Sequence, residues 1–207
     1  MSRPESPEDS KAAADIVDLY DRRAADWVAD RGRDLTEADR RWLDRLTAGL
    51  QPGDAVLDVG CGSGRPMAAA LIERGFRVTG VDSSANLIAH AAADLPEGRF
   101  VQADMRTLDL GQTFAGVLAW HSLFHLSPAD QRLALPRLLA HAAPRASVMF
   151  SSGPREEFVV GSWRGDPLYH GSLGPEDYQT LLTSRGFAAE TGLWADNGSV
   201  WLAHRMD

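Results

Sequence analysis

Apolar residues recur at steps of three and four near the start of the chain, the spacing that places them on one face of an α-helix. The first such stripe lies within residues 12–30 and consists of Ile16, Leu19, Tyr20, Ala24, Trp27 and Val28. A second helix is predicted after Thr36, which caps it together with Asp39 in an approximate capping box. Its apolar face consists of Trp42, Leu43, Leu46 and Leu50. Two amphipathic helices are therefore expected before the first strand.

From residue 56 onward, helical spacing gives way to short apolar runs, which favour strands. Val56–Val59 is apolar and β-branched in character, as is typical of a parallel strand covered on both faces. Further strands are predicted at residues 76–81, 100–103, 114–120 and 146–152. Asn197-Gly198 lies between two more apolar runs and indicates a hairpin near the end of the chain.

Helices are predicted between these strands. Ser83 or Ser84 is expected to cap a helix over residues 85–93, and Ser127 is expected to cap one that runs to about residue 143. Pro136 lies inside the second of these helices and is expected to break, kink or restart it. Strands that alternate with helices indicate an open α/β sheet, which binds its ligands at the carboxyl ends of the strands.

Three glycines at every second position, Gly60, Gly62 and Gly64, follow the first strand. Glycines let the chain turn sharply there and bring bare backbone close to a ligand. The spacing differs from the G-x-G-x-x-G fingerprint that cradles a pyrophosphate. Asp58 lies two residues before the first glycine, where a carboxylate would repel a pyrophosphate and attract an ammonium group.

Two further acids follow the next strands in order. Asp82 ends the second strand about 20 residues past the glycines, where a carboxylate can accept hydrogen bonds from two ribose hydroxyls. Asp104 and Met105 follow the third strand. With these acids in register, the D-x-G-x-G-x-G run resembles motif I of the class I S-adenosylmethionine-dependent methyltransferases of the small-molecule type. The resemblance spans roughly residues 50–150.

The resemblance implies a Rossmann-like, doubly wound α/β fold with a seven-stranded, mostly parallel sheet, a C-terminal antiparallel hairpin and N-terminal lid helices. It implies S-adenosyl-L-methionine as the cofactor. Asp58 is expected to face the cofactor's ammonium group directly or through water, Asp104 its adenine amino group, and Met105 the base. In such enzymes a lid tyrosine often faces the methionine part. Tyr20 and Trp27 are candidates for that contact, and core packing is the alternative for both.

The full set of expected cofactor contacts adds neighbours of these motif residues. Arg31 is available to a carboxylate, and His121, expected to be neutral beside a sulfonium, could flank the adenosine or the sulfonium. The predicted cofactor-binding residues are Tyr20, Trp27, Arg31, Asp58, Gly60, Cys61, Gly62, Gly64, Asp82, Ser83, Asp104, Met105, Trp120 and His121.

The methyl acceptor is expected at the ends of the fourth and fifth strands. His125 lies just past the fourth strand and is the candidate general base, since histidine titrates near neutral pH. Residues 153–174 are rich in glycine and aromatics and resemble the insert that covers the active site in small-molecule methyltransferases. Tyr169 and His170 in this insert are the other candidate catalytic residues. The alternatives are a packed histidine and a surface flap anchored by its aromatic side chains.

The length of the chain indicates its domain organisation, and its net charge limits the class of methyl acceptor. A chain of 207 residues fits one domain. We expect a disordered tail over residues 1–10 and a single methyltransferase domain over 11–207. Its parts are lid helices at 11–50, a cofactor-binding core at 54–152, a cover insert at 153–174, and a helix and hairpin at 175–207. The net charge of −8, with scattered arginines and one lysine, argues against a nucleic-acid acceptor.

Cysteine usage and hydropathy add weaker expectations. The single Cys61 excludes an internal disulfide and favours a reducing, cytoplasmic location. No apolar run is long enough to predict a membrane span, and no metal-ligand cluster is evident. A monomer or a homodimer fits the sequence equally well.

The leading hypothesis is an enzyme that transfers a methyl group from S-adenosylmethionine to an oxygen or nitrogen atom of a small molecule. A module that binds the cofactor without catalysis is the first alternative. A nicotinamide-dependent oxidoreductase is the second. The glycine spacing and Asp58 argue against the second, and a chain with one lysine contains no Tyr-x-x-x-Lys pair.

Overall fold

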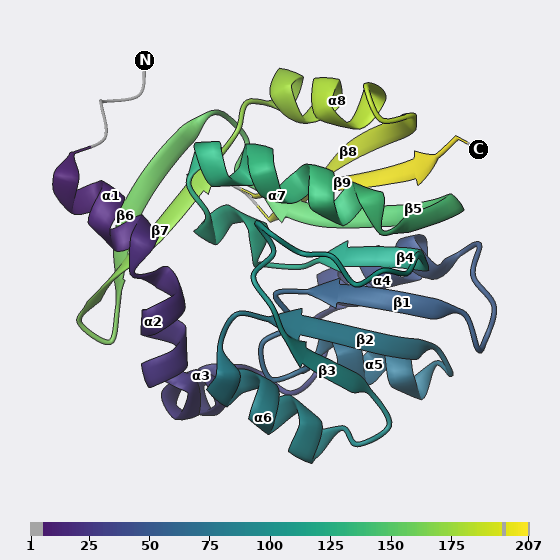
Figure 1. Cartoon of the computed structure of the whole chain (residues 1–207), viewed down its shortest axis with the longest axis horizontal. Coiled ribbons are helices and arrows are strands. Elements are labelled where there is room, and N and C mark those ends of the chain that lie inside the picture. Colours follow the sequence, from purple (N-terminus) through teal and green to yellow (C-terminus); the bar gives the residue numbers. More distant parts are fainter. Residues whose placement is uncertain (1–5, 196–197, 207) are drawn as a thin grey trace.

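A sheet of seven strands forms the centre of the molecule within residues 6–195 and 198–206, the part of the chain that the computed structural model describes (Figure 1). Its order is β3-β2-β1-β4-β5-β9-β8. The strands are β1 Ala55–Val59, β2 Arg77–Asp82, β3 Arg99–Gln102, β4 Phe114–Ala119, β5 Ala142–Ser152, β8 Phe187–Ala195 and β9 Gly198–Arg205. The first five are parallel, and β9 lies antiparallel between β5 and β8. The predicted mostly parallel sheet with a C-terminal antiparallel hairpin is confirmed; residues 196–197 of its turn lie outside the described residues.

Successive residues of β1 belong to two different cores, because side chains alternate across a strand. Val56 packs with α4 (Glu37–Thr47) and α5 (Met67–Glu73) on one face of the sheet. Leu57 and Val59 pack with α7 (Pro128–Ala140) and α8 (Pro175–Thr183) on the other. α6 (Ala85–Asp94) contacts β2 and β3 at one edge. Coverage on both faces explains why β1 is apolar at every position except Asp58, and it confirms the doubly wound arrangement.

The helix predicted over residues 12–30 is three shorter helices: α1 Pro7–Ala14, α2 Ile16–Arg22 and α3 Ala24–Asp30. Ile16, Leu19 and Ala24 are its buried stripe, as expected from their spacing. The disordered tail predicted through residue 10 is wrong for residues 6–10, because Ser6 and Asp9 form a capping box that starts α1. α1 then packs against the strand β7 (Asp166–Ser172).

The other helices begin where their caps predict. Thr36 and Asp39 form the expected capping box of α4, and Ser84, rather than Ser83, caps α6. α7 starts after Ser127 and continues through Pro136 as one helix, so the predicted break or restart does not occur. Leu135 and Leu138, on either side of the proline, are fully buried and hold both turns against the core.

The expected cover insert contains a β-hairpin, β6 Glu157–Trp163 and β7 Asp166–Ser172. Figure 1 shows it beside α1 and α2, beyond the carboxyl ends of the central strands. A short 3₁₀ turn, η1 (Leu123–His125), follows β4 and contacts β7. Among the described residues, none of the helices has the length and apolarity that crossing a bilayer requires.

Candidate active site

A cavity of about 1000 Å³ lies at the carboxyl ends of the parallel strands. The ends of β1 to β5 and the residues that follow them line its floor, and residues of α2, α3 and the β6–β7 hairpin line the rest. Three parts of the chain that are distant in sequence therefore share one cavity. This is the edge at which open α/β sheets bind their ligands.

The glycine turn after β1 needs its glycines for conformation and for space. Gly60, Gly62 and Gly64 have φ values of 71°, 55° and 79°, in the left-handed region. A Cβ on Gly60 would lie 2.2 Å from the Ser122 Cβ, and one on Gly62 would lie 2.7 Å from the Trp27 ring. The turn therefore fits tightly beneath the lid helix α3 and against the loop after β4.

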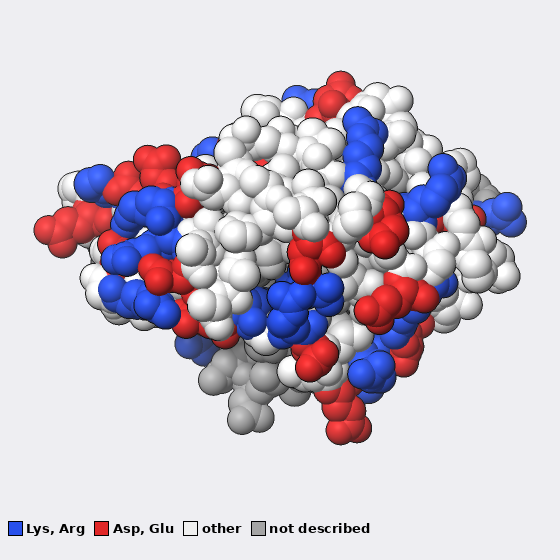
Figure 2. Space-filling model, turned by 90° about the horizontal axis from the view of Figure 1, so that it is seen from below, with Lys and Arg blue, Asp and Glu red and all other residues white. Residues whose placement is uncertain are grey.

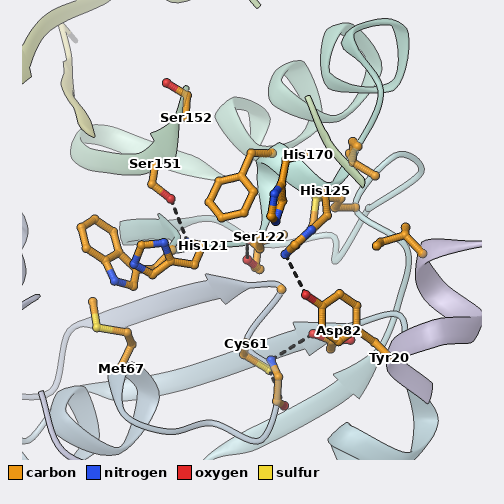
Figure 3. Close-up of a pocket in the computed structure, with 18 of the residues that line it drawn as sticks. Tyr20, Cys61, Met67, Asp82, His121, Ser122, His125, Ser151, Ser152 and His170 are labelled. Carbon is orange, nitrogen blue, oxygen red and sulfur yellow. Dashed lines mark hydrogen bonds between the residues drawn. The ribbon is translucent and has the colours of Figure 1, made fainter. Parts of the chain in front are cut away.

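Asp82 ties the end of β2 to this turn. Its Oδ2 accepts a hydrogen bond from the Gly62 backbone N–H and its Oδ1 one from that of Ser84, both at 2.9 Å (Figure 3). Burial raises the pKa of Asp82, and these backbone donors oppose the shift. The carboxylate is thus oriented, and each oxygen keeps a lone pair for another donor. Ser83 beside it lines the cavity.

Asp58 is a buried acid without a fixed partner. It is 2% exposed, lines the cavity, and accepts no hydrogen bond from any of the described residues. Burial, followed by the negative charge of Asp82, raises its pKa to about 7, and Arg31 opposes this. Arg31 lies over the Trp27 ring, 5.4 Å from its centre, on the lid side of the cavity. A cationic group placed against Asp58 would be strongly favoured.

Asp104 and Met105 lie on the other side of the glycine turn. Asp104 accepts hydrogen bonds from the backbone and the guanidinium of Arg106, which lowers its pKa. Arg106 also reaches Asp130 at the start of α7. Arg106 lines the cavity, a position that the sequence pattern did not indicate. Met105 extends toward Gly60, so its side chain lies along the floor.

Trp120 and His121 continue the floor after β4. The Trp120 indole N–H donates to Asp39 at 3.0 Å, which joins β4 to the capping box of α4. The His121 backbone has a φ of 52° and donates to the Ser151 hydroxyl at 2.8 Å (Figure 3). Burial lowers the pKa of His121 to about 4, with a further contribution from Arg31. The ring is therefore neutral at pH 7, as expected for a histidine beside a sulfonium.

His125 is held from two sides. Its Nδ1 lies 3.2 Å from the Tyr169 carbonyl oxygen, and its Nε2 lies 2.9 Å from the Tyr20 hydroxyl (Figure 3). Burial, and then the neighbouring His170, lower its pKa to about 3. Burial raises the pKa of Tyr20, so its hydroxyl stays protonated. Tyr20 therefore belongs to the cavity wall and not only to the packed stripe of its helix.

Tyr169 and His170 separate because successive residues of a strand face opposite ways. The Tyr169 side chain is fully buried, stacks on Phe158 and does not line the cavity. The expected acceptor contact through that ring therefore does not fit this structure; its carbonyl positions His125 instead. His170 lines the cavity, with its ring centre 4.9 Å from that of His125.

Several cavity residues were missed from the sequence. Ser122 donates to the Val59 carbonyl at 2.7 Å, and Ser151 holds the His121 backbone. Phe124 lies among the three cavity histidines, with its ring centre 4.8–5.9 Å from theirs. Their positions near the carboxyl ends of predicted parallel strands were the signal that could have identified them as cavity residues. Cys61 also lines the cavity, but burial raises the pKa of its thiol, which does not suit a nucleophile.

Ion pairs join the lid helices to the hairpin at the rim of the cavity. Asp166 in β7 accepts from Arg22 at 2.7 Å and from Arg23 at 3.0 Å. Arg164 at the hairpin turn reaches Asp30 at 2.9 Å, and the Trp163 ring stacks on Tyr20 at 6.1 Å. We call this set the hairpin–helix contact. It closes one side of the cavity.

Comparison with known proteins agrees with this geometry. Residues 56–145 match the methyltransferase domain family. The structure resembles magnesium protoporphyrin IX methyltransferase from Synechocystis PCC 6803 with bound S-adenosylmethionine, with a TM-score of 0.73 and 19% identity. That likeness covers 94% of this chain and 97% of the other.

Two curated relatives match over the central half of the chain. Trans-aconitate 2-methyltransferase from Azoarcus sp. (strain BH72) is 36% identical over 111 residues, 53% of this chain and 42% of the relative. The dTDP-3-amino-3,4,6-trideoxy-alpha-D-glucopyranose N,N-dimethyltransferase of Streptomyces venezuelae is 28% identical over 109 residues, 53% of this chain and 43% of the relative. The matches thus span less than half the length of either relative. The family match covers residues 56–145, less than half of this chain, and the structural likeness shows that the chain has the fold of a methyltransferase solved with bound S-adenosylmethionine.

Proposed function

We propose that this chain transfers a methyl group from S-adenosylmethionine to an oxygen or nitrogen atom of a small molecule. The observation that carries the proposal is the buried, unpartnered carboxyl of Asp58 at the base of a cavity that continues to a histidine-rich end. The volume of about 1000 Å³ is at the top of the range for one ligand site, which leaves room for a cofactor and an acceptor together.

The residues present fit this cofactor. Asp58 suits its ammonium group, and Arg31, on the lid side, suits its carboxylate. Asp82 has lone pairs for the two ribose hydroxyls, and Asp104 with Met105 would take the adenine. Gly60, Gly62 and Gly64 would let the backbone approach, with Cys61, Ser83, Trp27 and Trp120 around them. Three acids around the turn disfavour a pyrophosphate, which weakens the oxidoreductase alternative.

The cavity residues suit a methyl donor that carries a positive charge. When bound, the cofactor supplies a methyl group on a sulfonium, already activated for in-line displacement. His121 and His125 stay neutral at pH 7, so neither repels a sulfonium. The hairpin and the lid helices on one side of the cavity would orient an acceptor behind the reacting carbon, and such orientation can supply much of the rate.

The acceptor end of the cavity combines aromatic, hydroxyl and aliphatic groups. Phe124, Ser151, Ser152 and Leu168 lie there with the histidines. This lining supports a small acceptor with a ring and a polar nucleophile. Both atoms remain in the proposal, because relatives named as an O-methyltransferase and as an N,N-dimethyltransferase match the chain. Relatives named as methyltransferases also favour catalysis over a cofactor-binding module.

The surface fits a small-molecule acceptor better than a nucleic acid. The chain has a net charge of −8. Figure 2 shows blue and red side chains interleaved on the face that it presents, without a continuous basic stripe. Nucleic-acid sites need such a stripe. The cytoplasmic location and the monomeric or homodimeric state stay predictions.

Calorimetric titration tests the proposal directly. S-adenosylmethionine and S-adenosylhomocysteine should bind at one site per chain, and NADH should not. Incubation with methyl-labelled cofactor and a panel of phenols, hydroxy-heteroaromatics and amino sugars should then transfer label to an acceptor. Binding without any transfer would favour the non-catalytic module, and binding of NADH alone would refute the assignment.

A further inference from the structure

Three histidines converge on Phe124 at the acceptor end of the cavity, and their surroundings differ. Figure 3 shows His125 and His170 close together, with His121 farther along the floor. The ring centres of His125 and His170 are 4.9 Å apart. Each is a general-base candidate by residue type alone. Their hydrogen bonds decide which ring nitrogen has a free lone pair.

Both nitrogens of His125 are occupied. A carbonyl oxygen only accepts hydrogen bonds, so Nδ1 must donate its hydrogen to the Tyr169 carbonyl. In the neutral ring Nε2 then carries the lone pair, and that lone pair accepts the hydroxyl hydrogen of Tyr20 at 2.9 Å. His125 has no lone pair left for an acceptor's proton while this bond is made. Its geometry instead holds the lid residue Tyr20 in place.

His170 is differently placed. It lies on β7, with its side chain on the cavity side of the strand. Among the described residues, neither of its ring nitrogens has a hydrogen-bond partner. Phe124 and His125 pack against its ring, at 5.2 Å and 4.9 Å between centres. Burial lowers the pKa of His170, which keeps the ring neutral and its lone pair available at pH 7.

We propose that His170 is the general base of the methyl transfer and that His125 is a positioning residue that fixes Tyr20. This assignment rests on the proposed function. As the acceptor's oxygen or nitrogen bonds to the methyl carbon, the carbon–sulfur bond breaks and its electron pair stays on sulfur. The proton leaves the acceptor for the free nitrogen of His170. The positive charge thus passes from sulfur to an imidazolium, which returns the proton to water because His170 is only partly buried.

The test compares acceptors that need a base with acceptors that do not. Formation of S-adenosylhomocysteine is measured at pH 8 with unsubstituted phenol and with a nitrophenol that is already ionised. His170→Asn should slow turnover of phenol by about 10²–10⁴-fold, the range for a lost general base, and slow the ionised nitrophenol far less. His90→Asn, at an exposed histidine on α6, is the matched control and should leave both rates unchanged.

One further variant distinguishes a direct base at His170 from a proton relay through Tyr20. Tyr20→Phe removes the hydrogen bond to His125 and should raise the KM for the cofactor while kcat changes little. An equal loss for both acceptors in His170→Asn would assign that residue a packing role and overturn the proposal. So would a kcat loss in Tyr20→Phe as large as that in His170→Asn, because it would indicate a relay through Tyr20 to His125.

A chemical readout needs no acceptor. Diethyl pyrocarbonate reacts with histidine nitrogens that have a free lone pair, and mass spectrometry locates the adduct. His170 should react and His125 should not; the reverse pattern would overturn the assignment. Calorimetry with S-adenosylhomocysteine on the wild type and on His170→Asn should give equal affinity. Failure of the wild type to bind would refute the proposed function, whereas binding with the wrong reactivity pattern would refute only the choice of base.

Discussion

At the scale of single residues, the cavity depends on buried carboxyl groups at strand ends and on glycines that leave room. Asp82 is oriented by two backbone donors, and Asp58 has no donor among the described residues. The first is built to accept neutral hydroxyls, and the second is suited to a cation. Because their surroundings differ, replacing Asp82 and replacing Asp58 should have different effects.

Replacing Asp82 should weaken the proposed ribose contact. Asp82→Ala is expected to reduce the affinity for S-adenosylhomocysteine by about 1–3 kcal/mol, the scale of lost charge-assisted hydrogen bonds. Calorimetric titration measures it, and Asp44→Ala on the exposed face of α4 is the control. An affinity equal to that of the wild type would mean that the carboxylate does not contact the ligand.

Asp58 should make the free protein less stable as pH rises. Its pKa is raised to about 7 in the folded chain, from an ordinary value of 3.8. Between these values the folded chain binds this proton more tightly than the unfolded chain, so the free energy of unfolding falls as pH rises from about 4 to about 7. Asp58→Asn should gain stability relative to the wild type by about 2–4 kcal/mol over that window. Urea unfolding at pH 4, 5, 6, 7 and 8 measures the difference, and parallel profiles would contradict it.

Gly62 should be intolerant of a side chain for two reasons that a control can separate. Gly62→Ala adds left-handed backbone strain of about 1–2 kcal/mol and also a clash with the Trp27 ring. Gly111→Ala has the same strain, at a φ of 63°, with no atom near its Cβ. The first variant should therefore lose more free energy of unfolding than the second. Trp27→Leu in the Gly62→Ala background should restore part of the loss, and equal losses in the two alanine variants would contradict the clash.

At the scale of elements, two segments that lie far apart in the sequence close one side of the cavity. The hairpin β6–β7 meets α2 and α3 through the hairpin–helix contact, and Tyr20 on α2 reaches His125 on η1. A ligand enclosed there must wait for these segments to separate. Its exchange rate should therefore depend on their ion pairs.

The hairpin–helix contact should slow ligand exchange in a salt-dependent way. Exposed ion pairs are individually weak, and Asp166 takes part in two of them. Asp166→Asn should speed dissociation of S-adenosylhomocysteine about 2–10-fold at low salt, and the difference from the wild type should shrink at high salt because the pairs are screened. Stopped-flow tryptophan fluorescence measures the rates, with Asp44→Asn as the control. A salt-independent rate in the wild type would contradict a gating role.

At the scale of the whole molecule, one ligand would touch the lid helices, the strand ends and the loop after β4 together. Binding to the folded chain alone stabilises it by mass action. S-adenosylhomocysteine at 100 times its Kd should add about 2.7 kcal/mol, which raises the midpoint of thermal unfolding by about 5–11 °C for a chain of this size. NADH at the same concentration should not shift the midpoint. The opposite pattern in a thermal scan would contradict the assignment.

The local elements could be predicted from the order of the residues alone. Residue chemistry alone identified Thr36 and Ser127 as helix caps and Gly60 as a turn residue, whereas it left Ser83 and Ser84 as alternatives for the cap of α6. The apolar residues of β1 point to both faces and indicated a sheet covered on both sides, and the positions of the acids at the strand ends predicted that Asp58, Asp82 and Asp104 lie at the ligand-binding edge. These signals are local, because each depends on neighbours within a few positions.

The contacts between side chains of distant segments became known only from the folded chain. Because side chains alternate along β7, His170 faces the cavity and Tyr169 faces the core. No local pattern specified which face of the strand would line the cavity. Strand order brought Arg106, Ser122 and Ser151 to the cavity, and folding brought Tyr20 into contact with His125, which lies 105 positions away in the sequence. Contacts of this kind depend on how separate elements pack together. The spacing of residues along the chain does not specify the distance or the orientation between those elements.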